Sequence, residues 1–124
     1  AACSVSDRPP TILVCINREN VSNGTFWDNG VFALNTLAGH HQDLANAFSG
    51  LTGLSQDERF THGDWTKLST GAPVLADSMM SLDCEIVETA DMATHRVLFG
   101  KVTGVRIGDS LDPLTYFNRA YRVL

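Results

Sequence analysis

The sequence is poor in cysteine, with three in 124 residues and no CxxC pair. Because the count is odd, Cys3, Cys15 and Cys84 cannot all pair with one another, which favours reduced thiols in the cytoplasm. Cys15 and Cys84 lie in apolar runs, so we expect them to be buried and unreactive. The pattern excludes a small secreted domain held together by a full disulfide framework.

Positive charge is also scarce. Lysine and arginine number 9 against 14 acidic residues, which gives a formal net charge of −5 and a pI of about 5.1. A general nucleic-acid binder needs a basic surface, so that class is excluded. No apolar run reaches the length of a membrane-spanning helix and no signal peptide precedes the first strand, so we expect no membrane partner.

Several nucleotide, catalytic and metal motifs are missing. The chain has no G-x-G-x-x-G between a strand and a helix, no G-x-x-x-x-G-K-[ST] and no G-x-S-x-G. His40 and His41 form a histidine pair, but adjacent side chains diverge and no second ligand pair follows at a useful spacing. We therefore expect no metal site, and a solvated loop at these two histidines.

The chain does contain enough apolar sequence for one core, with 44% hydrophobic and 19% charged residues. A chain of this length forms one domain without staples, so we predict a single domain over residues 1–124. The opening "AACSVSD" reads as sequence from the middle of a domain. We expect an N-terminal segment to precede it in the natural protein.

Apolar runs predict strands along most of the chain. "TILVCIN" (residues 11–17) is rich in β-branched residues and indicates a strand buried on both faces. "VFALNTL" (31–37) predicts a second strand, and "THRVLFGKVTGVRIGD" (94–109) a long one whose internal glycines suggest bends or bulges. Residues 111–124 predict the last strand.

"SMMSLDCEIVET" (residues 78–89) alternates between apolar and polar side chains. The two faces of the predicted strand carry Met80, Leu82, Cys84 and Ile86 on one side and Ser81, Asp83 and Glu85 on the other. This pattern is typical of a half-buried antiparallel strand with its polar side chains toward solvent. Before it, glycine and proline in "GDWTKLSTGAPVL" (63–75) predict a strand, a turn and a strand.

Short helices are predicted between the strands. Ser22 or Asn23 can cap the first, which Gly30 ends. "HHQDLANAFSGLTGL" (40–54) carries one apolar stripe, and "SQDE" (55–58) fits a capping box. Strands nevertheless dominate, so we predict a mainly β fold with short inserted helices, arranged as a small antiparallel barrel rather than as βαβ units.

Three stretches, in this order, resemble the flavin reductase-like family: "AACSVSDRPPTILVCINR", then "DNGVFALNTLAGHHQDLANAFSG" with "DERF", then "THRVLFGKVTGV" followed by "LTYFNRAYRVL". The resemblance covers essentially the whole chain. Within this family, the chain is similar to the reductase components of two-component flavin monooxygenases, and in particular to the corrin reductase of cobalamin synthesis.

The resemblance implies a split β-barrel homodimer that binds FMN, or sometimes FAD, and reduces it with NADH or NADPH. Reduced flavin would then be supplied to a monooxygenase partner. The family also carries a helix and a first strand before this point, which the chain is expected to lack. Hydride transfer is the cofactors' own chemistry, so the protein needs to stack the rings and hold the phosphates.

The same resemblance assigns two groups of flavin-binding residues. Residues 1–6 match the family's flavin-edge loop, in which Ala2, Cys3 and Ser4 would offer backbone N–H groups and a hydroxyl. The phosphate loop and the helix start after it are matched by Asn17, Arg18, Ser22 and Asn23. Glu19 and Val21 depart from the serines common there, and an ordinary helix cap is the alternative reading.

The remaining residues are implied for the nucleotide side of the site. His95 matches a histidine near the nicotinamide or flavin, where it would act as a proton or hydrogen-bond donor. Tyr116, Arg119 and Tyr121 would stand at the mouth of the site, for stacking and for phosphate attraction. The alternative for His95 is an ordinary surface residue at the start of a strand. The alternative for Arg122 is a rim position on a strand at a dimer interface.

Three functions remain open from the sequence. The first is an NAD(P)H-dependent flavin reductase. The second is a corrin reductase, in which reduced flavin passes an electron to cobalt(II) of a corrinoid. The third is a flavin-binding or other ligand-binding module without turnover, which would bind its ligand and leave NAD(P)H unconsumed.

Overall fold

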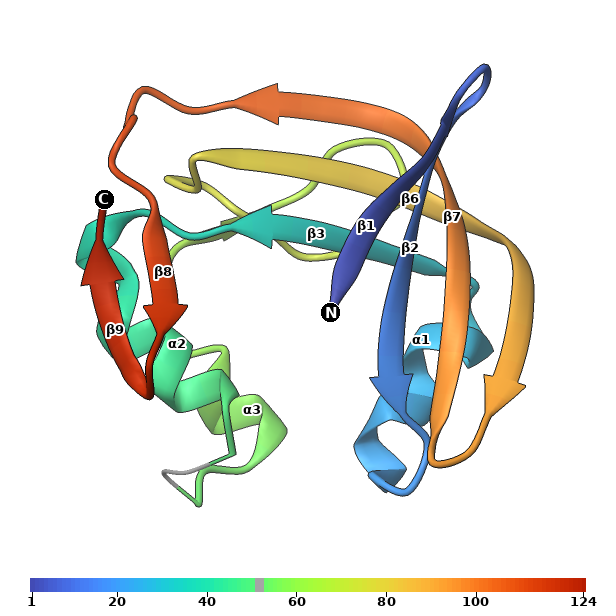
Figure 1. The fold of residues 1–124 in the computed structure, drawn as a ribbon, viewed down its shortest axis with the longest axis horizontal. Helices are drawn as coiled ribbons and strands as arrows, with labels where there is room; N and C mark the ends of the chain where they lie inside the picture. Colours follow the sequence, from blue (N-terminus) through green and yellow to red (C-terminus); the bar gives the residue numbers. More distant parts are fainter. Residues whose placement is uncertain (51–52) are drawn as a thin grey trace.

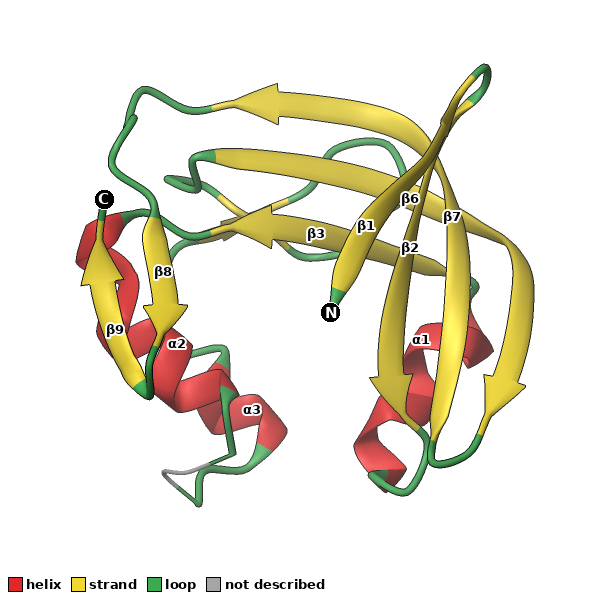
Figure 2. Cartoon of the chain, viewed as in Figure 1, coloured by secondary structure: helices red, strands yellow, loops and turns green. Residues whose placement is uncertain are grey.

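A computed structural model of the chain describes residues 1–50 and 53–124. The elements follow one another as β1 (Ala2–Asp7), β2 (Pro10–Asn17), η1 (Val21–Asn23), α1 (Gly24–Asn29), β3 (Val31–Thr36), η2 (Gly39–His41), α2 (Gln42–Phe48), α3 (Gln56–Arg59), β4 (Trp65–Thr66), β5 (Val74–Leu75), β6 (Met80–Met92), β7 (His95–Ile107), β8 (Leu114–Phe117) and β9 (Ala120–Val123). Figure 1 traces them along the chain, and Figure 2 shows that strands predominate.

The main sheet has five antiparallel strands in the order β1-β2-β7-β6-β3. It curls strongly (Figure 1), and β1 and β3 are its two edge strands. The predicted mainly β, antiparallel fold with short helices is confirmed. The described strands form an open sheet rather than a closed barrel.

The core lies inside the curl, where β2, β3, β6 and β7 contribute Ile12, Val14, Phe32, Cys84 and Leu98. All five are buried, and Cys84 and Leu98 are fully enclosed. Burial of such side chains supplies the main driving force for folding. The predicted strand over residues 11–17 is confirmed by β2, but only the face that carries Ile12 and Val14 is buried, whereas burial on both faces was expected.

Gly100 in β7 allows the closest packing in this core. A Cβ atom built on Gly100 would lie 2.5 Å from Cζ of Phe32 and 2.9 Å from Cβ of Cys84. Both neighbours are enclosed, so we expect Gly100→Ala to lower the free energy of unfolding by about 2 kcal/mol through overpacking. Urea denaturation checks this, with the exposed neighbour Lys101→Ala as control; equal midpoints for the two variants would contradict it.

The helices follow most of their predicted signals, but Asn23 precedes α1 without a side-chain cap bond. Gly30 ends α1 with a left-handed φ of 72°. At α3, Ser55 Oγ accepts from the Glu58 backbone N–H, and Glu58 Oε1 accepts from the Ser55 N–H, each at 3.2 Å, which confirms the capping box. The predicted helix over residues 40–54 is confirmed as α2, although shorter, and its residues 51–52 lie outside the described part of the chain.

The two ends of the chain differ from their predictions. Residues 1–6 were expected as a loop, but Ala2–Asp7 pairs with β2 as an edge strand, because the following turn folds the chain back on itself. The closing stretch is not one strand but the hairpin β8–β9. Asn118 and Arg119 form its turn with left-handed φ values of 51° and 62°, which suit a tight two-residue hairpin turn.

The alternation over residues 78–89 gave the right strand but the wrong environment for its polar face. Ser81 and Asp83 are fully buried instead of solvated. The loop before β5 covers this face of β6, and its backbone and hydroxyl groups hydrogen-bond to Asp83. Among the described residues, none of the helices is long and apolar enough to cross a membrane.

Candidate functional site

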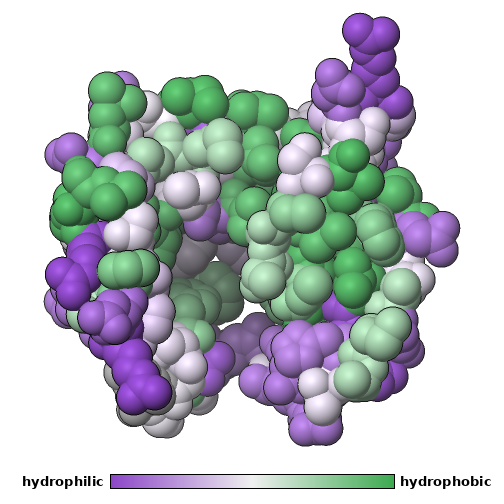
Figure 3. Space-filling model, in the orientation of Figure 1, coloured by the Kyte–Doolittle hydropathy of each residue, from purple (hydrophilic) through white to green (hydrophobic). Residues whose placement is uncertain are grey.

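A pocket of about 570 Å³ opens beside the outer edge of β3. Its walls come from α1, α2, α3 and the loop before β5, and its lining is mostly apolar. The space-filling view shows the molecule hollowed on this face, between the curled sheet and the α2–α3 region (Figure 3). This size and lining are typical of small-molecule and cofactor sites.

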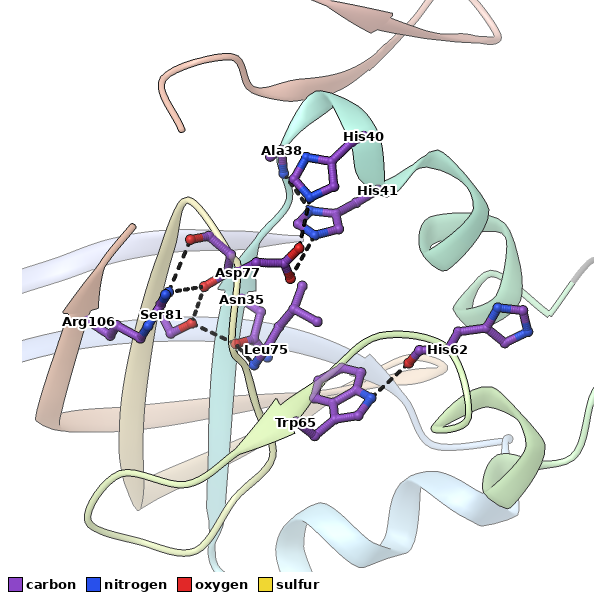
Figure 4. Close-up of polar contacts among 11 residues, drawn as sticks. Asn35, Ala38, His40, His41, His62, Trp65, Leu75, Asp77, Ser81 and Arg106 are labelled. Carbon is purple, nitrogen blue, oxygen red and sulfur yellow. Dashed lines mark hydrogen bonds and ion pairs between the residues drawn. The ribbon is translucent and has the colours of Figure 1, made fainter. Parts of the chain in front are cut away.

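One wall of the pocket is an aromatic trio, Phe48, Phe60 and Trp65. Their ring centroids lie 5.1, 5.0 and 5.7 Å apart for the pairs Phe48–Phe60, Phe60–Trp65 and Phe48–Trp65. Trp65 is fixed by a 2.8 Å hydrogen bond from Nε1 to the His62 carbonyl oxygen (Figure 4). The rings meet edge-on or tilted, with interplanar angles of 85°, 64° and 60°, so they hold one another in place as an apolar wall.

A partly buried chain of hydrogen bonds leads from Arg106 to Asn35, a residue of the pocket wall (Figure 4). Arg106 donates to Ser78, Ser78 Oγ lies 2.6 Å from Ser81 Oγ, and Ser81 Oγ donates to Asn35 Oδ1 at 2.8 Å. Because arginine can only donate, the whole chain runs in one direction and fixes the orientation of the Asn35 amide. Asn35 itself lines the pocket.

The predicted phosphate-loop residues come together after β2. Asn23 Nδ2 donates to the Asn17 carbonyl oxygen at 2.9 Å. Asn20, which the sequence reasoning did not assign, accepts from both the backbone N–H and the hydroxyl of Ser22, at 3.2 and 2.8 Å. An asparagine two residues before a serine at a helix start is a cap signal, and it would have identified Asn20.

Arg18 from the same loop is held by the β6–β7 turn. Its guanidinium donates to Asp91 at 3.1 Å and to the Ala93 carbonyl oxygen. Arg96 also pairs with Asp91, at 2.6 Å, and stacks 4.6 Å from the centre of the Trp27 ring. The bond from Arg96 is the main cause that lowers the pKa of Asp91. In this arrangement the guanidinium of Arg18 faces the carboxylate of Asp91.

His95 lies at the same end of the sheet as this loop. It starts β7, pairs with Asn17 across β2, and its Nδ1 lies 2.8 Å from Thr94 Oγ1. The Arg18 backbone N–H donates to the Thr94 carbonyl oxygen at 2.9 Å. The structure therefore places His95 beside Asn17 and Arg18, with Asn23 bonded to Asn17, and the imidazole is exposed.

The other predicted residues stand elsewhere around the hollow. Ala2, Cys3 and Ser4 lie on the exposed edge strand β1. Tyr116 and Tyr121 pair across the β8–β9 hairpin with ring centroids 5.1 Å apart, and Arg119 lies in its turn. In Figure 1 this hairpin lies beside α2, on the opposite side of the molecule from α1.

The side chains of His40 and His41 were expected to diverge, and this prediction is wrong. Both rings face Asp77, whose carboxylate oxygens lie 2.8 and 3.0 Å from the two Nε2 atoms (Figure 4). His41 is buried, and its Nδ1 accepts from the Ala38 N–H at 2.9 Å, which places the ring proton on Nε2. The bond with His40 is the main cause that lowers the pKa of Asp77. The carboxylate of Asp77 thus bridges the imidazoles of His40 and His41.

The cysteines differ in reactivity. Burial, with a further contribution from Asp83, raises the pKa of Cys84 to about 11, while Cys3 is exposed. Cys15 is half-buried, so the predicted burial is right for Cys84 and wrong for Cys15. Because the thiolate is the reactive form, Cys84 should resist alkylation by iodoacetamide in the folded protein, whereas Cys3 should react. Peptide mass spectrometry after brief labelling at mildly alkaline pH checks this; equal labelling of both would contradict the buried position of Cys84.

Comparisons with known proteins show the family of this chain. The model of the flavin reductase like domain matches residues 1–124. The FMN reductase (NADH) RutF of Agrobacterium fabrum is 48% identical over 124 residues, which are 100% of this chain and 70% of that protein.

Solved structures give the same result. A protein of Haemophilus somnus 129PT superposes with a TM-score of 0.95 at 40% identity, over 100% of this chain and 78% of that one. BorF, the flavin reductase component of a bacterial two-component tryptophan halogenase, superposes with a TM-score of 0.88 at 26% identity, over 99% and 78%. This chain belongs to the flavin reductase-like domain family.

Proposed function

We propose that this chain is the catalytic domain of an NAD(P)H-dependent FMN reductase. The observation that carries the proposal is the 48% identity with an FMN reductase (NADH), over the full length of this chain. Bound FMN would supply the redox chemistry, as the acceptor of a hydride from the nicotinamide. The protein's own task is to hold the two ring systems together and exclude water.

The pocket residues fit a flavin. A flat heterocycle needs apolar faces, and the aromatic trio supplies one of them. The polar edge of such a ring needs hydrogen-bond partners, and the lining includes the side-chain amides of Asn29 and Gln56. We place the flavin ring in this pocket, with Gln56 and Asn29 available to its polar edge.

The predicted site residues keep their proposed roles around the hollow. Ala2, Cys3 and Ser4 do not line the pocket, so of their predicted partners they would serve the ribityl chain of the flavin, with the loop of Asn17, Arg18, Ser22 and Asn23 near the phosphate. Because several donors of this loop already have partners, phosphate binding requires it to exchange hydrogen bonds. His95 would act at the nicotinamide, and the β8–β9 hairpin with Tyr116, Arg119 and Tyr121 would cover the nucleotide.

Anaerobic mixing of the protein with FMN and either NADH or NADPH tests the function. We expect FMN absorbance and nicotinamide absorbance to fall together, at equal molar rates, and faster with the preferred nucleotide. FMN binding without any bleaching would leave a binding module instead. FAD in place of FMN, under the same conditions, establishes the flavin preference.

We further propose that the reduced flavin is released to a monooxygenase-type partner. BorF, which shares this fold, is the reductase component of a two-component enzyme, and this supports a separate acceptor. Adding a corrinoid to the anaerobic mixture tests the alternative. Electron transfer to cobalt in a flavin-dependent manner would favour the corrin reductase.

A homodimer is proposed from an exposed apolar surface near the C-terminus. Its members, called the C-terminal apolar surface, are Val105, Ile107, Leu111, Phe117, Val123 and Leu124, each of them 55% or more exposed. Hydrophobic residues gather on this side of the molecule (Figure 3), and exposed apolar patches mark interaction sites. Light scattering should give twice the chain mass, and Phe117→Asp should shift it toward the monomer.

The domain is proposed to include an additional helix and strand. Among the described strands, β1 and β3 each have one edge without a partner strand, and such edges are normally paired or covered. Relatives in the family are also longer than this chain.

A location in the reducing cytoplasm is proposed as well, supported by three cysteines that are all free.

A further inference from the structure

One wall of the pocket has no regular secondary structure for most of its length. Residues 69–75, here called the strap, lead from the loop after β4 into β5, and Thr70, Gly71, Ala72 and Pro73 line the pocket. Gly71 has a left-handed φ of 87°. Since no helix or long strand sets its shape, the strap depends on side chains that hold it from outside.

Asp83 of β6 holds the beginning of the strap. Its Oδ2 accepts from the backbone N–H groups of Ser69 and Thr70, each at 2.8 Å, and from Ser69 Oγ at 3.1 Å. Its Oδ1 accepts from Thr70 Oγ1 at 2.5 Å. Asp83 is fully buried, and a buried carboxylate is tolerated when it is saturated with hydrogen bonds in this way.

Asn35 of β3 holds the end of the strap (Figure 4). Its Oδ1 accepts from the Leu75 backbone N–H at 3.0 Å, and its Nδ2 donates to the Pro73 carbonyl oxygen at 3.2 Å. The chain from Arg106 through Ser81 fixes the orientation of this amide, so its two ends cannot exchange roles.

The two anchors lie close together in the sheet. Asp83 pairs with Ala33, and Asn35 with Ser81, two positions further along the β3–β6 ladder. Side chains two apart in a strand point to the same face, so Asn35 and Asp83 approach the strap from one rigid surface. Four of the strap's seven residues are thereby bonded to side chains of the sheet.

We propose that Asp83 and Asn35 are positioning residues of the flavin pocket, which hold the strap in the shape that receives the ring. The inference rests on the proposed flavin reductase function. Neither residue takes part in hydride transfer. They act through Thr70, Gly71 and Pro73, by keeping the wall in place before the ligand arrives, which lowers the ordering cost of binding.

Two nearly isosteric variants test the proposal. Asp83→Asn replaces one acceptor oxygen with a donor, and Thr70→Val removes the hydroxyl that donates to Asp83. We expect each to weaken FMN binding about 10-fold, measured by quenching of flavin fluorescence, and to alter the visible circular dichroism of the bound flavin.

Asp77→Asn is the matched control. It removes another hydrogen-bonded carboxylate, in the turn between β5 and β6, whose partners are His40 and His41 and not the strap. Its FMN affinity should equal that of wild type even if its stability falls. If Asp83→Asn and Thr70→Val also bind FMN as wild type does, the inference is wrong. A wild-type chain that binds no FMN would overturn the proposed function itself.

Discussion

Asp83→Ala should lower the free energy of unfolding by about 4 kcal/mol, a loss at the upper end for single substitutions. The change removes the acceptor for two backbone N–H groups and two hydroxyls, and it leaves a cavity under the strap. Each buried donor without an acceptor costs about 1–3 kcal/mol, and the effects are not fully additive. Urea denaturation measures the difference directly.

The control is Asp109→Ala, which removes another carboxylate outside the strap's network. We expect it to change the free energy of unfolding by less than about 0.5 kcal/mol, as for surface substitutions away from special features. A loss below about 1 kcal/mol for Asp83→Ala would mean that water or other groups replace the carboxylate readily, contrary to the proposed clamp.

The contribution of Asp83 should also depend on pH. Burial acts to raise the pKa of Asp83, but the hydrogen bonds from Thr70 and Ser69 together outweigh it and lower the pKa below its ordinary value of 3.8. Because the pKa of Asp83 is lower in the folded protein than in the unfolded chain, the ionised carboxylate stabilises the fold fully at pH values above its pKa in the unfolded chain. This stabilisation is lost as the pH falls through its pKa in the folded protein. The stability difference between wild type and Asp83→Asn should therefore shrink in acid.

His95→Ala should reduce kcat for NADH-dependent FMN reduction about 100-fold, the lower range for loss of a positioned proton or hydrogen-bond donor. The side chain is exposed and starts β7, next to the loop of Asn17 and Arg18. Stability should change little, because its side-chain contact is with the neighbouring Thr94. Single-turnover mixing of reduced nucleotide with the FMN-loaded protein measures the effect on the chemical step.

His62→Ala is the matched control for this prediction. His62 is also exposed, and it holds Trp65 through its backbone carbonyl oxygen, which the substitution leaves in place. Its kcat should equal that of wild type. An unchanged kcat in His95→Ala would remove His95 from the site and leave it as a surface residue at a strand start.

Local patterns predicted the strands and helices well because they report local physics. The β-branched run of β2, the capping box at Ser55 and the glycine that ends α1 each act within a few residues. Alternation in β6 showed which side chains share a face, but not what covers that face. Burial of Ser81 and Asp83 depends on a loop that is distant in sequence, which is why they were assigned to solvent.

The candidate site shows the same division. The resemblance selected Asn17, Arg18 and His95, which the β2–β7 ladder brings together. It gave no signal for the aromatic trio, for Asn35 or for Asp83, whose roles arise from packing between separate elements. The hairpin turn at Asn118 was missed because two consecutive non-glycine residues with positive φ are uncommon, although asparagine is the residue that tolerates this best.

The most direct test of the account is an FMN titration of the wild-type chain and of two variants that each add one phenyl ring. Ala45→Phe fills the pocket from α2, whereas Ala90→Phe adds the same group on an exposed part of β6. We expect Ala45→Phe to weaken FMN binding at least about 10-fold and Ala90→Phe to bind as wild type, because overfilling a ligand pocket excludes its occupant. Equal affinity in all three proteins would contradict the placement of the flavin in this pocket.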